Sequence, residues 1–75
     1  MNKQQLIEKY TSLYGVGYAE GQQTNNQIAY QTILSALRNN DTVEQANYRI
    51  QWSLEFCPNQ DRREIYKTFL EETSK

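Results

Sequence analysis

The ionisable side chains best suited to catalysis or ion binding lie in the last third of this 75-residue chain. Four carboxylates are close together there: Asp61, Glu64, Glu71 and Glu72. Carboxylates bind divalent cations and transfer protons. At helical spacing, however, these four do not converge over the apolar floor that a catalytic pocket needs. We therefore expect no metal site and no bound cofactor.

The chain has one cysteine and no histidine. Histidine is the commonest general base and the commonest transition-metal ligand. The chain therefore lacks the residue that most often fills either role. Cys57 has no imidazole to activate it and falls on an aliphatic helix face, which predicts a buried, unreactive thiol. We expect a protein that is not an enzyme.

A dense basic cluster is formed by Arg62, Arg63 and Lys67. Arginine binds phosphate groups and acidic partners. The neighbouring carboxylates favour another interpretation, a solvated helix face whose charges neutralise one another. The chain has eight basic and nine acidic residues and a pI near 5.3, so it exerts no long-range attraction on nucleic acid. A dimeric nucleic-acid-associated regulator that uses this cluster and Arg49 is the alternative function.

Tyr48, Trp52 and Phe56 follow one another at intervals of four residues and form one helix face, called here the aromatic face. The opposite face of the same segment is aliphatic: Val43, Ala46, Ile50, Leu54 and Cys57. Aromatic clusters supply much of the binding energy of protein interfaces. We predict a protein-binding surface here, with Arg49 and Gln45 as its polar rim. The alternative is a central helix with both faces covered.

The first helix is predicted to begin at Asn2 or Lys3. Its apolar, aromatic and glycine residues share one arc about 140° wide: Leu6, Ile7, Tyr10, Leu13, Tyr14, Gly17, Tyr18 and Gly21. Gly15 and Gly17 cost about 2 kcal/mol of helix propensity relative to alanine, so a break near residue 15 is the alternative. Gly17 and Gly21 predict either the close approach of another helix or a turn.

Tyr10, Tyr14 and Tyr18 form an aromatic stripe along this first segment. Tyrosine rings stack on nucleic-acid bases. They also suit half-buried positions, where the ring packs against the core and the hydroxyl reaches water. We expect the second arrangement.

A second helix is predicted over residues 25–38, because Thr24 and Gln27 match a capping box, in which each side chain satisfies a backbone donor of the first turn. The residues expected in the core are Ala29, Tyr30, Ile33, Leu34, Ala36 and Leu37. Those expected to face water are Gln27, Gln31, Ser35 and Arg38. The sequence allows one long helix over residues 3–38 as well as two.

A third helix is predicted to begin at the capping box of Thr42 and Gln45. It is predicted to end at Cys57, because Pro58 disfavours helical geometry in the preceding residue. A fourth helix follows, capped by Asn59 or Asp61. Its buried arc is expected to contain Ile65, Tyr66, Phe69 and Leu70, with Glu64, Lys67 and Glu71 outside.

The whole pattern predicts an all-α fold, a compact bundle of three or four short helices that forms a single domain over residues 1–75. Hydrophobic residues make up 37% of the chain and the mean hydropathy is −0.92, so the core is small. Association with a protein partner or with a second copy would add stability. No segment approaches the roughly 18 apolar residues of a membrane span, and the opening MNKQQ has no signal-peptide pattern, so we expect a cytoplasmic protein.

Two stretches, MNKQQLIEKY at the start and AYQTILSAL at residues 29–37, resemble the small, polar, Tyr- and Gln-rich early proteins of phages that infect Gram-positive bacteria. The resemblance covers about the first half of the chain. It implies a small phage product that binds a host protein, such as a defence protein, and inhibits or redirects it. The resemblance transfers no catalytic residue to this chain.

Overall fold

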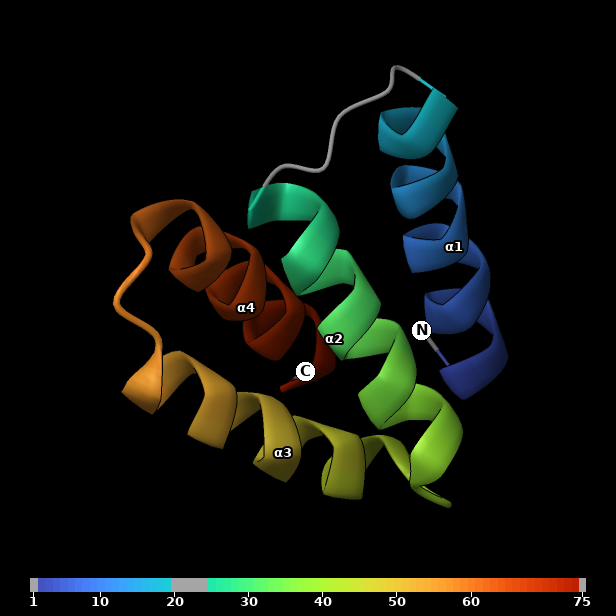
Figure 1. The fold of residues 1–75 in the computed structure, drawn as a ribbon. Helices are drawn as coiled ribbons and strands as arrows, with labels where there is room; N and C mark the ends of the chain where they lie inside the picture. Colours follow the sequence, from blue (N-terminus) through green and yellow to red (C-terminus); the bar gives the residue numbers. More distant parts are fainter. Residues whose placement is uncertain (1, 20–24, 75) are drawn as a thin grey trace.

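The computed structural model describes residues 2–19 and 25–74, which form four α-helices and contain no strand. The helices, labelled in Figure 1, are α1 (Lys3–Ala19), α2 (Asn25–Asn39), α3 (Val43–Phe56) and α4 (Gln60–Thr73). The predicted all-α fold is confirmed, and the first two segments are separate helices. No helix of the described ranges is long and apolar enough to cross a bilayer.

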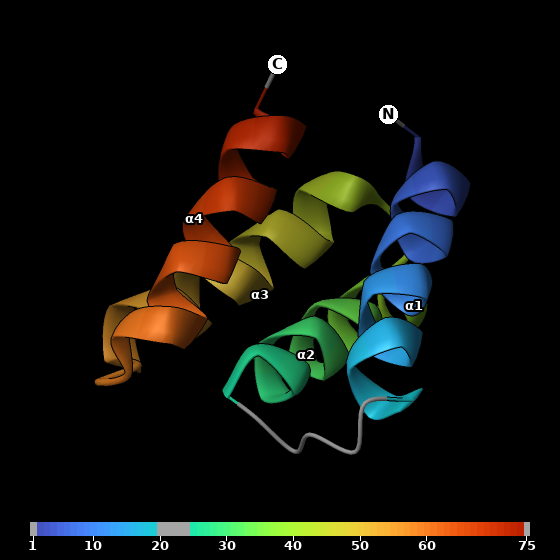
Figure 2. The same ribbon diagram turned by 90° about the horizontal axis from the view of Figure 1, so that it is seen from above.

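Helix α2 lies at the centre of the bundle and packs against each of the other three helices. Figures 1 and 2 show α1 along one side of α2, with α3 and α4 grouped on the other. The buried apolar core draws on all four helices: Leu6, Tyr10, Ala29, Ile33, Leu34, Ala36, Leu37, Ala46, Ile50, Cys57, Tyr66 and Phe69. Since α2 occupies the middle, α3 is covered from one side.

Helix α1 continues through both of its described glycines, as predicted, and buries Leu6 and Tyr10. The prediction that the whole arc packs against the bundle is wrong for its outer residues, because Leu13 and Tyr18 are 37% and 63% exposed. The main neighbour of α1 is α2. One neighbouring helix covers a narrower stripe than the arc of about 140° that the sequence pattern suggested.

Gln27 is the clearest departure of α2 from its pattern. The sequence places it on the solvent face, and this is wrong: Gln27 is buried, and its Nε2 donates to the Tyr14 carbonyl oxygen at 2.7 Å. A Cβ atom on Gly17 would lie 2.1 Å from Gln27 Oε1, so the missing side chain makes room for this amide. Gly17 thus serves close approach and not a turn. Thr24 and Gly21 lie outside the described residues.

The predicted capping box of α3 and the predicted start of α4 are confirmed, and α3 ends at Phe56, one residue before the predicted Cys57. Thr42 Oγ1 accepts from the Gln45 amide at 3.2 Å, and Gln45 Oε1 accepts from the Thr42 amide at 3.3 Å, which completes the capping box. The chain becomes extended at the residue before Pro58. Asn59, and not Asp61, caps α4, because Asn59 Oδ1 accepts from the Arg62 amide at 3.0 Å.

Candidate interaction surface

The aromatic face lies on the outside of the molecule. Tyr48, Trp52 and Phe56 are 64%, 49% and 68% exposed. The Trp52 and Phe56 rings are stacked, with centroids 5.3 Å apart and planes at 17°, and the Tyr48 ring meets Trp52 edge-on at 6.5 Å. The three rings therefore form a continuous row along α3. The alternative, a third helix with both faces covered, is wrong, because α2 occupies the central position.

The inner face of α3 is fully used by the core. Ala46 and Ile50 have no exposed surface, and Val43 and Leu54 pack against the core from its edge. Cys57, at the end of the helix, is buried and unpaired. The two-faced helix predicted from the sequence is thus present, with aliphatic residues inside and aromatic residues outside.

Two hollows adjoin the aromatic face. One lies at the start of α3 and includes Tyr48 and Trp52 in its lining. The other, called here the α2–α3 groove, has a volume of about 850 Å³ and includes residues of α1, α2 and α3. Both hollows share Asn40, Arg49 and Ser53 as lining residues. The polar flank of the aromatic face therefore opens directly into the groove.

Among the described residues, the lining of the α2–α3 groove contains two cations and no acid. It consists of Thr11, Tyr14, Gln31, Thr32, Leu34, Ser35, Ala36, Arg38, Asn39, Asn40, Arg49 and Ser53. The sequence pattern predicts Arg49 at the polar rim of the aromatic face and places Arg38 only on the water-facing side of its helix. Arg38 is conspicuous in the sequence, because few charged residues surround it. That it lines the same groove as Arg49 depends on how α2 and α3 pack, which the sequence does not show.

The predicted basic cluster is divided by the fold. Arg63 Nη1 donates to the carbonyl oxygens of Leu54 at 2.9 Å and Cys57 at 3.2 Å, and so serves the C-terminal end of α3. Arg62 is half-buried, whereas Lys67 is exposed. A solvated face neutralised by nearby acids is the wrong description of Arg63, which is held by carbonyl groups. Contact of the cluster with nucleic acid stays a prediction.

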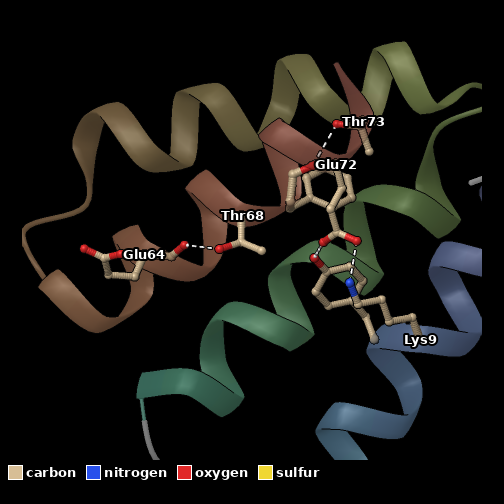
Figure 3. Close-up of polar contacts among 7 residues, drawn as sticks. Lys9, Glu64, Thr68, Glu72 and Thr73 are labelled. Carbon is tan, nitrogen blue, oxygen red and sulfur yellow. Dashed lines mark hydrogen bonds and ion pairs between the residues drawn. The ribbon is translucent and has the colours of Figure 1, made fainter. Parts of the chain in front are cut away.

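The carboxylates are also separated by their roles. Figure 3 shows Glu72 beside Lys9, with which it forms an ion pair, and its Oε1 accepts a hydrogen bond from the Tyr10 hydroxyl at 2.7 Å. Burial raises the pKa of Glu72, but the hydrogen bonds from Lys9 and Tyr10 outweigh burial and bring the pKa below its ordinary value. Among the described residues, no three His, Cys, Asp or Glu side chains are placed to hold a metal ion.

The tyrosine stripe changes character along α1. Tyr10 is buried, and its hydroxyl meets Glu72 and not water, so the expectation of a solvent-exposed hydroxyl is wrong for this residue. Burial, followed by the influence of Glu72, raises the Tyr10 pKa well above its ordinary value. Tyr14 is half-buried, and its ring stacks on the exposed ring of Tyr18 at 6.3 Å.

Comparison with protein-family models, with curated proteins and with solved structures gave no significant match.

Proposed function

We propose that this protein is a non-enzymatic binding module that occupies a surface of a protein partner with its aromatic face. The observation that supports the proposal is the exposed ring row of Tyr48, Trp52 and Phe56, opposite a helix face that the core already fills. Large contiguous patches of exposed apolar surface are uncommon on monomeric proteins and mark interaction sites.

The physical properties of the row suit binding. Tryptophan and tyrosine are enriched among the residues that dominate interface energies, because each buries a large area with few rotatable bonds. Burial of apolar surface contributes about 25 cal/mol per Å², so covering three such rings is worth several kcal/mol. The rings stand on a helix with both ends fixed by caps, so little order has to be imposed on binding.

The resemblance to early phage proteins suggests a host protein, such as a defence protein, as the partner, and the cytoplasm as the place of action. Inhibition would then follow from occupation of the host protein's own functional surface. A second copy of the chain is the other protein that could cover the aromatic face, and sedimentation velocity measures this directly.

The experiment is affinity capture from a lysate of the native host with three proteins: the native chain, Trp52→Ala and Val16→Ala. Val16 is the matched control, because it is an apolar residue on α1 with 58% exposure. We expect the native chain and Val16→Ala to retain the same partner, and Trp52→Ala to lose it. Circular dichroism should show equal helix content in all three.

Sedimentation velocity of the same three proteins separates self-association from binding to another protein. A native dimer that Trp52→Ala converts to a monomer would identify the second copy as the partner. If Trp52→Ala keeps every partner of the native chain and the same sedimentation coefficient, the proposed function is wrong. Loss of helix content in Trp52→Ala would also contradict it, because the ring would then belong to the core.

A further inference from the structure

The two flanks of the aromatic face differ in charge. At 100° per residue, Arg49 lies about 60° to one side of Trp52 and Glu55 about 60° to the other. Glu44, the acid that lines the hollow at the start of α3, lies about 140° around the helix from Arg49. The flank with Arg49 is the one that opens into the α2–α3 groove. An occupant of the aromatic face therefore meets positive charge on the groove side.

The cations of the groove have no partner within the part of the chain that the structure describes. Arg38 and Arg49 both line the groove, and neither guanidinium donates a hydrogen bond or joins an ion pair with a described residue. The remaining lining residues that can form hydrogen bonds are neutral: amides, hydroxyls and one phenol. Guanidinium groups bind carboxylates through paired, charge-assisted hydrogen bonds.

We propose that the partner segment that covers the aromatic face is acidic on one side, with carboxylates that reach Arg49 and Arg38 in the α2–α3 groove while its apolar residues cover Tyr48 and Trp52. This inference rests on the proposed function and specifies the chemistry of the partner. The observation that selects it is the groove beside the aromatic face, whose described lining contains Arg38 and Arg49 and no acid.

A protein segment fits the charge distribution better than a nucleic acid does. Nucleic-acid binding gains most of its affinity from several phosphate contacts and is assisted by a positive field around the protein. The groove contains two arginines, and the chain carries a net charge of −1. A partner segment with a few carboxylates beside apolar side chains can bind both arginines. It does so without contacting the acidic residues elsewhere on the surface.

The experiment uses three synthetic peptides of about 16 residues, long enough at 1.5 Å per residue to cover α3. Each has the same leucine stripe at helical spacing and glutamine along one flank; the other flank carries glutamate, glutamine or lysine. A short oligothymidine is the fourth probe. Trp52 is the sole tryptophan of the chain, so its fluorescence reports occupation of the aromatic face when the probes lack tryptophan and tyrosine.

We expect the glutamate peptide to bind at least about tenfold more tightly than the lysine peptide, with the glutamine peptide between them. Arg49→Glu should weaken binding of the glutamate peptide about tenfold, because a like charge then faces its carboxylates. Lys67→Glu is the matched control: it changes the net charge equally at an exposed site on α4 and should leave the Kd within about twofold. Calorimetry replaces fluorescence for Trp52→Ala, which should bind none of the peptides.

Equal binding of the three peptides, or equal effects of Arg49→Glu and Lys67→Glu, would overturn the inference. So would the absence of any peptide binding, or binding of oligothymidine in place of the glutamate peptide. None of these results alters the outcome of the capture experiment with Trp52→Ala, so failure of this inference and failure of the proposed function are distinguishable.

Discussion

At the scale of single residues, the burial of Gln27 on α2 depends on the absence of a side chain at Gly17 on α1. Gln27 is polar but buried, and it fits because Gly17 carries no Cβ. From polarity alone, glutamine is predicted on the solvent-facing side of a helix. The sequence does not show that α1 leaves space for this side chain or that the Tyr14 carbonyl oxygen accepts its hydrogen bond. Burial of an amide costs little when its hydrogen bonds are formed.

Gly17→Ala and Gly15→Ala should therefore have different effects on stability. Gly15 has open space around the position of a Cβ, so alanine should stabilise the protein by about 1 kcal/mol through helix propensity. Alanine at Gly17 must displace the Gln27 amide and break its hydrogen bond, which costs about 1–3 kcal/mol. We expect Gly17→Ala to be at least about 1 kcal/mol less stable than Gly15→Ala in urea denaturation. Equal stabilities would show that Gln27 moves aside without cost.

At the scale of helices, the connection between α3 and α4 depends on Arg63. Its guanidinium binds carbonyl oxygens at the end of α3 from a position in the first turn of α4. The last carbonyls of a helix have no partner within the helix, so an external donor is valuable there. Arg63 thus joins the two helices across Pro58.

Arg63→Ala should lower the free energy of unfolding by about 1–2 kcal/mol, because the carbonyl oxygens lose a charged donor in a partly buried site. Lys67→Ala, on the exposed side of the same helix, should change it by less than about 0.5 kcal/mol. Thermal and urea unfolding of the two variants provide the comparison. If Arg63→Ala is as stable as Lys67→Ala, the role of Arg63 lies outside folding, and phosphate contact gains support.

The helices themselves were largely predictable, because their ends depend on local signals. The capping box of Thr42, the break at Pro58 and the cap at Asn59 each involve residues within a few positions. The order of packing was not predictable. The two apolar faces of α3 leave open whether this helix is central, with both faces covered, or peripheral, with one face free; in the structure α2 takes the centre. That choice depends on contacts between distant helices, and it decides whether the aromatic face is covered.

At the scale of the whole molecule, a polar cluster joins the first helix to the last. Lys9 and Tyr10 on α1 meet Glu72 on α4, and the Tyr10 ring packs edge-on against Phe69 at 5.7 Å. Figure 3 shows Lys9 and Glu72 at the point where the two helices approach. No local pattern predicts this cluster, because its members are 62 and 63 residues apart in sequence.

Stability should depend on pH through Glu72. Its pKa is lower in the folded protein than the ordinary 4.5, so the unfolded chain binds the proton more readily. The stabilisation is therefore complete above about pH 4.5 and is lost as the pH falls through the folded pKa. We expect Glu72→Gln to be less stable than the native protein at neutral pH, by about 1 kcal/mol, and to lose less stability on acidification.

Urea denaturation at several values from pH 7 downward measures this difference. Glu71→Gln is the control, because Glu71 is the exposed neighbour of Glu72 and should leave the native pH profile unchanged. Parallel profiles of the native protein and Glu72→Gln would show that the ion pair and the Tyr10 hydrogen bond do not contribute to folding.

Because α3 lies at the periphery, the side chains that pack in the core and those that form the outer surface are on opposite faces of this helix. Positions 48, 49, 52 and 56 point away from an interior that Ala46 and Ile50 complete on the other side. The exposed residues of α3 can therefore be substituted one at a time in evolution without disturbing the packing of the interior. A chain this short gains a surface whose specificity can evolve while its architecture is inherited unchanged.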